Sequence, residues 1–295
     1  MPVKAVSISE NVGGVSVDGS EFVKSVLDYK FLNSGFEDKD DPAAPDSFLI
    51  LPKSAPPGEK LPLICVPHGG PHSGSVASYI PSYAYLSSLG YGILHVNYRG
   101  SLGYGDGFLD SLPGHCGSKD VEDCVKAVKF ALDSHGDILD KDRVGVCGGS
   151  HGGYLAGHLT SQHPDVFKVA AMRNPVTNIA TMVTATDIPD WCYVESTGSY
   201  DFDTFKVPSA DQLDKMFKSS PAYHVKNVKS PTLVAIGMSD LRVPPSQGKE
   251  WYYALKSMGV PSKLLCYKDD SHPISIPMSE GDHWINIAEW FKEHL

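Results

Sequence analysis

The chain has 295 residues and a formal net charge of −10, with 41% hydrophobic and 20% charged residues. This balance is typical of a globular protein with a sizeable core. No lysine- or arginine-rich block occurs, so we do not expect a nucleic acid partner. There is no run of 18 apolar residues and no apolar stretch after a basic start. We therefore expect no membrane span, no signal peptide and a cytoplasmic location.

The N-terminal part predicts little regular structure. Residues 1–44 form a strand-and-loop segment that is partly irregular, and residues 36–45 and 52–60 are loops by their proline, glycine and charge content. Between these loops, 47–51 (SFLIL) has the pattern of a strand. We place the start of the main domain at residue 45, so that it spans 45–295.

From residue 61 onward, short apolar segments alternate with amphipathic ones. Gly90 follows one predicted helix as its C′ residue, and Ser118 precedes another as its N-cap. In chain order the segments are strand 61–66, helix 79–89, strand 91–97, helix 118–134, strand 143–147, helix 154–162, strands 167–172 and 232–236, helix 246–258, strand 263–267 and helix 283–294. The pattern predicts an α/β fold, with a mainly parallel sheet and helices on both faces. Residues 177–228 interrupt this alternation, and we expect them to form a lid or one wall of the pocket.

Six widely spaced cysteines show no C-x-x-C motif and no Cys/His ligand spacing. They are Cys65, Cys116, Cys124, Cys147, Cys192 and Cys266. This spacing predicts buried free thiols in a reducing compartment, with no zinc site. We expect no cofactor and no metal.

Residues 148–152 (GGSHG) follow a predicted strand and precede a predicted helix. A G-x-S-x-G sequence in this setting is typical of a nucleophile elbow, whose glycines permit a tight, strained turn. Ser150 is therefore the candidate nucleophile. The N–H groups at the start of the following helix favour negative charge beside it.

A serine nucleophile needs a base and an acid that orients the base. Asp240 follows the strand 232–236, and His272 follows the strand 263–267, so both should lie at the carboxyl edge of the sheet with Ser150. We rank Asp269 and Asp270 below Asp240, because they are too close in sequence to His272 to orient it easily. The competing bases are His283, His151 and His68.

Acyl transfer also needs N–H donors for the oxyanion. We expect one from the backbone of His151, whose side chain should point away from the oxyanion. The second should come from the loop 68–71 (HGGP) after the strand 61–66, and we choose the backbone N–H of Gly70.

Several motifs occur in order along the chain: HGGP at 68–71, NYRGS at 97–101, GGSHGGY at 148–154, RNPV at 173–176, DLRVP at 240–244 and DSH at 270–272. Together they resemble the motif set of the prolyl oligopeptidase family, most closely its acylaminoacyl peptidases, over about residues 45–295. The resemblance implies an α/β-hydrolase fold and a serine peptidase that releases an N-acylated amino acid from a short peptide.

The resemblance also implies individual roles. Ser150 would be the nucleophile, Asp240 the orienting acid and His272 the base. Arg242 would hold a substrate carbonyl beside the scissile bond, with a salt bridge within its loop as the alternative.

Members of this family carry an N-terminal β-propeller that screens access to the active site. We find no propeller-length segment and no blade-like repeat, so we expect a catalytic domain alone, either as a fragment or as a naturally short form. Two other functions therefore stay open: a carboxylesterase for small esters, and an inactive hydrolase-fold fragment that acts as an interaction module. A homo-oligomer also stays open. Trp191, Tyr193 and Phe202 either line a side-chain pocket or belong to the core.

Overall fold

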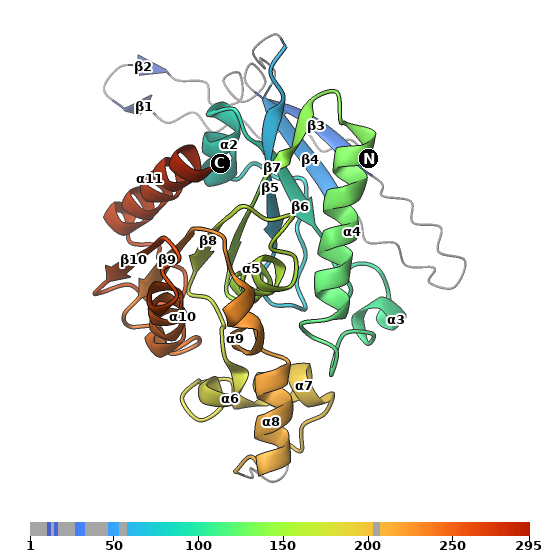
Figure 1. Cartoon of the computed structure of the whole chain (residues 1–295), viewed down its shortest axis with the longest axis vertical. Coiled ribbons are helices and arrows are strands. Elements are labelled where there is room, and N and C mark those ends of the chain that lie inside the picture. Colours follow the sequence, from blue (N-terminus) through green and yellow to red (C-terminus); the bar gives the residue numbers. More distant parts are fainter. Residues whose placement is uncertain (1–10, 13–14, 17–26, 33–46, 53–57, 203–206) are drawn as a thin grey trace.

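The computed structural model describes residues 11–12, 15–16, 27–32, 47–52, 58–202 and 207–295. Its centre is an eight-stranded sheet in the order β10-β9-β8-β7-β5-β6-β4-β3 (Figure 1). The strands are β3 (Leu27–Leu32), β4 (Ser47–Pro52), β5 (Leu61–Pro67), β6 (Gly92–Val96), β7 (Leu139–Gly149), β8 (Val169–Arg173), β9 (Thr232–Gly237) and β10 (Ser262–Tyr267). The six strands from β10 to β6 are parallel, whereas β4 pairs antiparallel with both β6 and β3. A separate two-stranded ladder joins β1 (Asn11–Val12) to β2 (Val15–Ser16).

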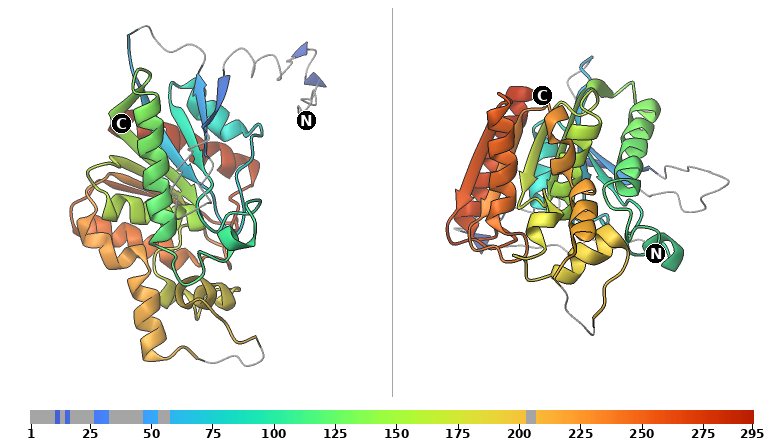
Figure 2. Two further views of the ribbon diagram at one scale, coloured as in Figure 1. Left: turned by 90° about the vertical axis from the view of Figure 1, so that its right-hand side faces the viewer. Right: turned by 60° about the horizontal axis from the view of Figure 1, so that its bottom comes forward.

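Helices cover both faces of this sheet, and the two hydrophobic clusters show which helix lies on which face. One cluster contains buried residues of α4 (Lys119–Ser134), α5 (His151–Gln162) and α10 (Pro245–Ser257). The other contains buried residues of α2 (Pro81–Ser88) and α11 (Pro277–His294). Figure 2 shows α4 and α11 on opposite sides of the strands. The predicted α/β-hydrolase architecture, a mainly parallel sheet between two helical layers, is therefore confirmed.

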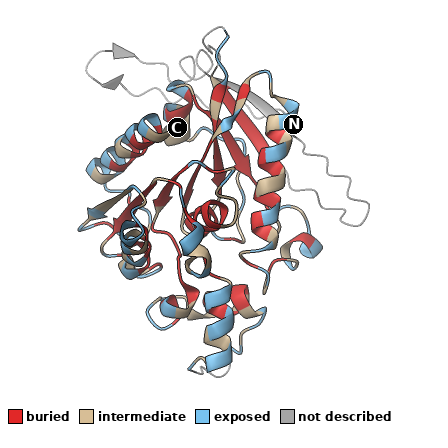
Figure 3. Cartoon of the chain, viewed as in Figure 1, coloured by how far each residue is buried: buried red, intermediate tan, exposed pale blue. Residues whose placement is uncertain are grey.

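Successive side chains of a strand point to opposite faces of the sheet, so each strand contributes to both hydrophobic clusters. In β5, Leu63 and Cys65 belong to one cluster while Ile64 and Val66 belong to the other. A strand that is covered on both faces must be apolar at successive positions, which explains the continuous apolar runs of the sequence. Figure 3 shows the resulting buried strands at the centre of the molecule.

Some predicted boundaries were wrong. Helix α5 begins at His151 and not at residue 154, because the helix starts directly at the elbow. Helix α11 begins at Pro277 and not at residue 283, since a proline fits the first turn of a helix, where its missing N–H is not needed. Ser118 occupies the N-cap position of α4 but makes no capping bond; its hydroxyl donates to the His115 carbonyl. Gly90 does have the positive φ expected of a C′ glycine.

The described residues of the segment 177–228 (177–202 and 207–228) form small helices at one end of the molecule, the lower end in Figure 1. They are α6 (Ile179–Met182), α7 (Pro189–Thr197), α8 (Ala210–Lys218), α9 (Pro221–His224) and the 3₁₀ turn η1 (Val225–Asn227). A further short helix, α3 (Asp106–Leu109), precedes α4. No helix in the described part of the chain is both long enough and apolar enough to cross a membrane.

Candidate active site

Ser150 lies in a strained turn between β7 and α5. Its φ of 59° and ψ of −123° are rarely adopted by a residue with a side chain, and such strain is typical of a nucleophile elbow. Gly148 and Gly152 make the turn sterically feasible. A Cβ at Gly148 would lie 2.1 Å from the Gly152 oxygen, and one at Gly152 would lie 2.3 Å from the Pro67 oxygen. The Ser150 N–H donates to the carbonyl of Arg173 at 2.9 Å, which ties the turn to the end of β8.

Asp240 and His272 come from the loops after β9 and β10, and the structure pairs their side chains. His272 Nδ1 donates to Asp240 Oδ2 at 2.7 Å. The other carboxylate oxygen of Asp240 accepts the backbone N–H groups of Arg242 and Val243 at 2.9 and 3.0 Å. Asp240 is buried, whereas His272 is partly exposed. With Nδ1 occupied by the carboxylate, Nε2 is the ring nitrogen that remains for a proton acceptor role.

Asn174 joins the loops that carry this pair, and sequence reasoning assigned it no role. Its Oδ1 accepts the Gly237 N–H at 2.8 Å, and its Nδ2 donates to the His272 carbonyl at 2.7 Å. The φ of Asn174 is 39°, in the left-handed region that asparagine tolerates better than most residues. The sequence offered two signals: the RNPV motif at 173–176 contains Asn174, and the residue directly follows β8, at the same sheet edge as the loops after β9 and β10.

The loop after β5 lies against the elbow. A Cβ at Gly69 would be 3.3 Å from the Gly149 oxygen and 3.5 Å from Ser150 Cβ, so the backbone of this loop lies in close contact with the nucleophile turn. The carbonyl of Gly70 accepts the Trp191 Nε1–H at 2.9 Å. The peptide between Gly70 and Pro71, which follows the Gly70 N–H, is thus held by a side chain of α7.

The His151 side chain points away from the cleft, as the sequence predicted for the residue after the nucleophile. Its ring is fully buried, and Nε2 lies 3.0 Å from Asp120 Oδ2. It stacks on Tyr154 at 4.8 Å between ring centroids and meets Trp191 edge-on at 5.9 Å. The backbone N–H of His151 opens α5, where helical N–H groups lack intrahelical acceptors.

A cleft of about 460 Å³ brings the predicted residues together. Ser150, His272, Arg242 and Gly70 all line it, while Asp240 supports His272 from behind. Met182, Ile188, Asp190 and Trp191 supply one wall, so the segment 177–228 does contribute a pocket wall.

Arg242 lines the cleft and also forms an ion pair. Its Nε and Nη2 donate to the two carboxylate oxygens of Asp187 at 2.8 and 3.3 Å. Asp187 belongs to the segment 177–228, so the ion pair joins two loops and is not within one loop. This pairing holds the pKa of the half-exposed Asp187 below its usual value.

The residues that compete for the roles of base and acid make other contacts or lie at the surface. Burial lowers the pKa of His68 to about 4, and its Nε2 lies 2.7 Å from the Ser101 hydroxyl. Burial likewise lowers the pKa of His283 to about 4, and its Nδ1 donates to the Ser279 carbonyl at 2.8 Å. Asp270 is buried and accepts the Ile276 N–H, so it braces the His272 loop. Asp269 is exposed.

The three aromatic residues predicted for a side-chain pocket or the core lie in three different environments. Trp191 lines the cleft, and Tyr193 is buried in the core. Phe202 is 76% exposed, so both predicted roles were wrong for this residue. All six cysteines are free and five are buried; Cys266 is exposed, which corrects the expectation that all would be buried.

Comparison with known proteins identifies the family. A model of the prolyl oligopeptidase family matches residues 78–295. The chain belongs to the prolyl oligopeptidase family. It is 48% identical to the acylamino-acid-releasing enzyme of Arabidopsis thaliana over 247 aligned residues. The aligned region is 84% of this chain and 32% of that protein. The human acylamino-acid-releasing enzyme is 40% identical over 250 residues, covering 85% and 34%.

Solved structures agree with this family. Pyrococcus horikoshii acylaminoacyl peptidase aligns with a TM-score of 0.81 and 27% identity, over 96% of this chain and 44% of that one. A puromycin-hydrolyzing peptidase from Mycobacterium tuberculosis aligns with a TM-score of 0.74 and 25% identity, over 91% and 39%. The chain spans about a third of the length of the two acylamino-acid-releasing enzymes that it matches.

Proposed function

We propose that the chain is a serine peptidase of the acylaminoacyl type, which cleaves an N-acylated amino acid from a short peptide through an acyl-enzyme. The observation that carries the proposal is the pairing of His272 with Asp240 at 2.7 Å beside the cleft that exposes Ser150. The relatives named for release of acylamino acids support the choice of substrate. Residues 45–295 carry the catalytic residues in this proposal, and β3 (Leu27–Leu32) from the preceding segment adds the edge strand to the sheet of this domain.

The geometry suggests one course for the reaction. His272 Nε2 accepts the hydroxyl proton as Ser150 Oγ attacks the carbonyl carbon, and Asp240 stabilises the imidazolium that forms. The N–H groups of His151 and Gly70 bind the oxyanion. His272 then protonates the leaving amine. Water, deprotonated by His272, attacks the acyl-enzyme and releases the acylated amino acid.

Arg242 is proposed to contact a substrate carbonyl beside the scissile bond. Its guanidinium has five N–H groups, and the ion pair with Asp187 uses only two of them. The remaining donors are available to a ligand in the cleft, so the ion pair and substrate binding are compatible. Asp187 then serves to aim the guanidinium.

The free thiols accord with a reducing compartment, so we place the protein in the cytoplasm. Hydrolysis of small esters is the second candidate function, because the same nucleophile and oxyanion donors act on both amides and esters. Esters have the better leaving group, so an esterase needs less help from groups that position the substrate.

The test compares the parent chain with Ser150→Ala on N-acetyl-alanine anilide. We expect hydrolysis by the parent and a loss of about 10³-fold or more in the variant. A parent that cleaves an activated ester but not the anilide would favour the esterase. A parent that cleaves neither and does not react with a fluorophosphonate probe would overturn both functions and favour the interaction module.

A further inference from the structure

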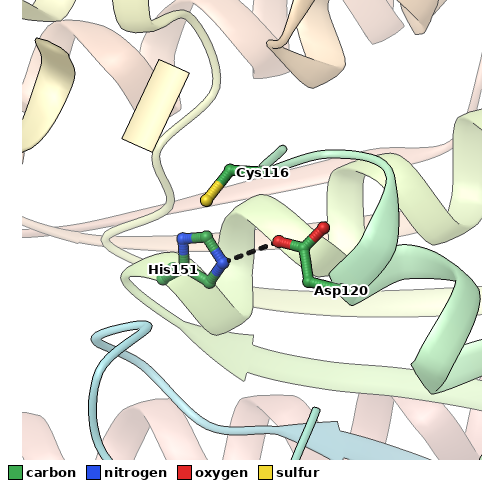
Figure 4. Close-up of side chains that lie close together, drawn as sticks. All are labelled: Cys116, Asp120 and His151. Atoms are coloured by element: carbon green, nitrogen blue, oxygen red, sulfur yellow. Dashed lines mark hydrogen bonds and ion pairs between the residues drawn. The ribbon is translucent and has the colours of Figure 1, made fainter. Parts of the chain in front are cut away.

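Cys116, Asp120 and His151 form a buried cluster behind the nucleophile (Figure 4). Cys116 lies in the loop before α4, Asp120 in the first turn of α4, and His151 at the start of α5. One ligand atom from each lies within 4.8 Å of the others. No more than 4% of any of these residues is exposed. The proposed hydrolysis uses only the backbone of His151, so no step of it needs these three side chains.

The three side chains supply a thiol, an imidazole and a carboxylate, which together are a ligand set that suits Zn²⁺. Neighbouring ligand atoms in a tetrahedral zinc site lie about 3.3–3.7 Å apart, given bonds of about 2.0–2.3 Å. The present separation of His151 Nε2 and Asp120 Oδ2 is 3.0 Å. Small side-chain shifts would therefore admit the ion.

The cluster has unused ligand capacity. His151 Nδ1 is buried and has no hydrogen-bond partner among the described residues. Figure 4 shows the Cys116 sulfur pointing toward the imidazole ring. A small turn of the ring would present either nitrogen to an ion held by Cys116 Sγ and an Asp120 oxygen. Binding would release the thiol proton to solvent and leave the imidazole neutral.

A second buried carboxylate adds negative charge to this region. Glu195 Oε2 accepts the Cys116 thiol proton at 3.1 Å, and its Oε1 lies 3.0 Å from Nε2 of the partly exposed His72. Two carboxylates beside one thiol favour a divalent cation, and Glu195 is close enough to the sulfur to become a further ligand after a small movement.

A second cleft lies beside the cluster, apart from the substrate cleft. This cleft of about 430 Å³ is lined by Cys116 together with His115, Gly117 and His224. It shares no lining residue with the cleft that contains Ser150. An ion can therefore approach Cys116 while substrate occupies the active site.

We propose that Cys116, Asp120 and His151 form a zinc site, reached from this second cleft, that inhibits the hydrolase. The inhibitory part rests on the proposed function, because it acts through the backbone N–H of His151 as an oxyanion donor. An ion that draws the imidazole toward Cys116 and Asp120 changes the position of that N–H. The spacing of the cysteines cannot indicate such a site, since Cys116 is its only cysteine and His151 comes from a different segment than Cys116 and Asp120.

The binding test needs no substrate. Co²⁺ titrated into the chelator-treated full chain should give tetrahedral d–d bands and a thiolate-to-cobalt charge-transfer band, which one equivalent of Zn²⁺ abolishes. We expect the charge-transfer band to be absent in Cys116→Ala and in the near-isosteric Cys116→Ser. It should persist in Cys266→Ala, which removes the exposed thiol. Absence of the band from the parent, or its persistence in both Cys116 variants, would overturn the site.

The activity test is separate. In a Zn²⁺ buffer that fills the site, the parent should lose about tenfold in kcat with little change in KM, as expected for a weakened oxyanion donor. Cys116→Ala should keep its activity in the same buffer. Equal inhibition of both proteins would overturn the inhibitory role, even if cobalt binds at Cys116. A chain without any hydrolytic activity would refute the proposed function and leave the cobalt test decisive for the site.

Discussion

The side-chain amide of Asn174 donates to the backbone carbonyl of His272 at 2.7 Å. The two residues are 98 positions apart in the chain, and Asn174 is almost completely buried. Because Asn174 Oδ1 also accepts the Gly237 N–H, a single side chain sets the spacing of the loops after β9 and β10. That spacing decides whether Asp240 can reach His272.

We expect Asn174→Asp to lower kcat by about tenfold and the free energy of unfolding by about 2 kcal/mol, because a carboxylate oxygen would face the His272 carbonyl without a proton to donate. Steady-state kinetics and urea denaturation measure the two effects. Asn178→Asp is a matched control, since Asn178 Nδ2 donates to Glu250 Oε1 at 2.9 Å away from the His272 loop. The control should lose stability but keep its kcat; an equal loss of kcat in both variants would contradict the role of Asn174.

Trp191→Phe tests whether the hydrogen bond from Trp191 to the Gly70 carbonyl holds the loop 68–71 in place. The substitution keeps an aromatic ring against His151 but removes the N–H that binds the Gly70 carbonyl. Losing one hydrogen bond of about 1 kcal/mol should reduce kcat about fivefold with little loss of stability. Trp290→Phe is the control, because the buried Nε1 of Trp290 has no partner among the described residues. An unchanged kcat in Trp191→Phe would show that this bond does not hold the oxyanion loop.

Arg242→Lys separates substrate binding from structure. A lysine keeps the charge but loses the planar donors, so KM should rise about tenfold if the guanidinium binds a substrate carbonyl. The ion pair itself is half-exposed and worth at most about 1 kcal/mol. Asp187→Asn should therefore barely change the melting temperature and should raise KM less than Arg242→Lys. Equal KM values for the parent and Arg242→Lys would show that Arg242 does not bind substrate and serves only in the ion pair with Asp187.

His158 should make stability depend on pH. Burial lowers its pKa to about 3, and its Nε2 bonds the Ser219 carbonyl at 3.0 Å. In the unfolded chain a histidine has a pKa of about 6.5, so below this value the unfolded state binds a proton that the folded state does not. The free energy of unfolding therefore falls as pH falls from about 6.5 toward about 3, by about 1.4 kcal/mol per pH unit from this residue.

His158→Gln removes this proton uptake. Urea denaturation at pH 6, 5 and 4 should show a flatter profile for the variant than for the parent, by about one proton. Parallel profiles would mean that His158 is protonated in the folded state. His163→Gln, at the C-cap of the same helix, is a control with a smaller expected change, because His163 is only half-buried and its pKa is lowered less.

Several features of the fold and of the candidate site could be predicted from local patterns. A strand that is buried on both faces must be apolar, and the residue after a parallel strand must lie at the carboxyl edge of the sheet. These two rules placed Ser150, Asp240 and His272 at one edge, although their catalytic roles remain predictions. Element boundaries were less accurate: the start of α11 at Pro277 follows from the fit of proline in a first helical turn, and hydrophobic periodicity does not include this rule.

Only the tertiary structure shows which distant residues meet. The bonds from Asn174 to His272, from Trp191 to Gly70 and from His151 to Asp120 join positions 98, 121 and 31 residues apart. Sheet order contributes to these contacts: β8, β9 and β10 are consecutive neighbours, and β7 lies next to β5 because the chain crosses over from β6 past β5. Hydrophobic periodicity determines which face of each element is buried. It carries no information about which polar side chain will stand opposite another, and that is decided when the layers pack.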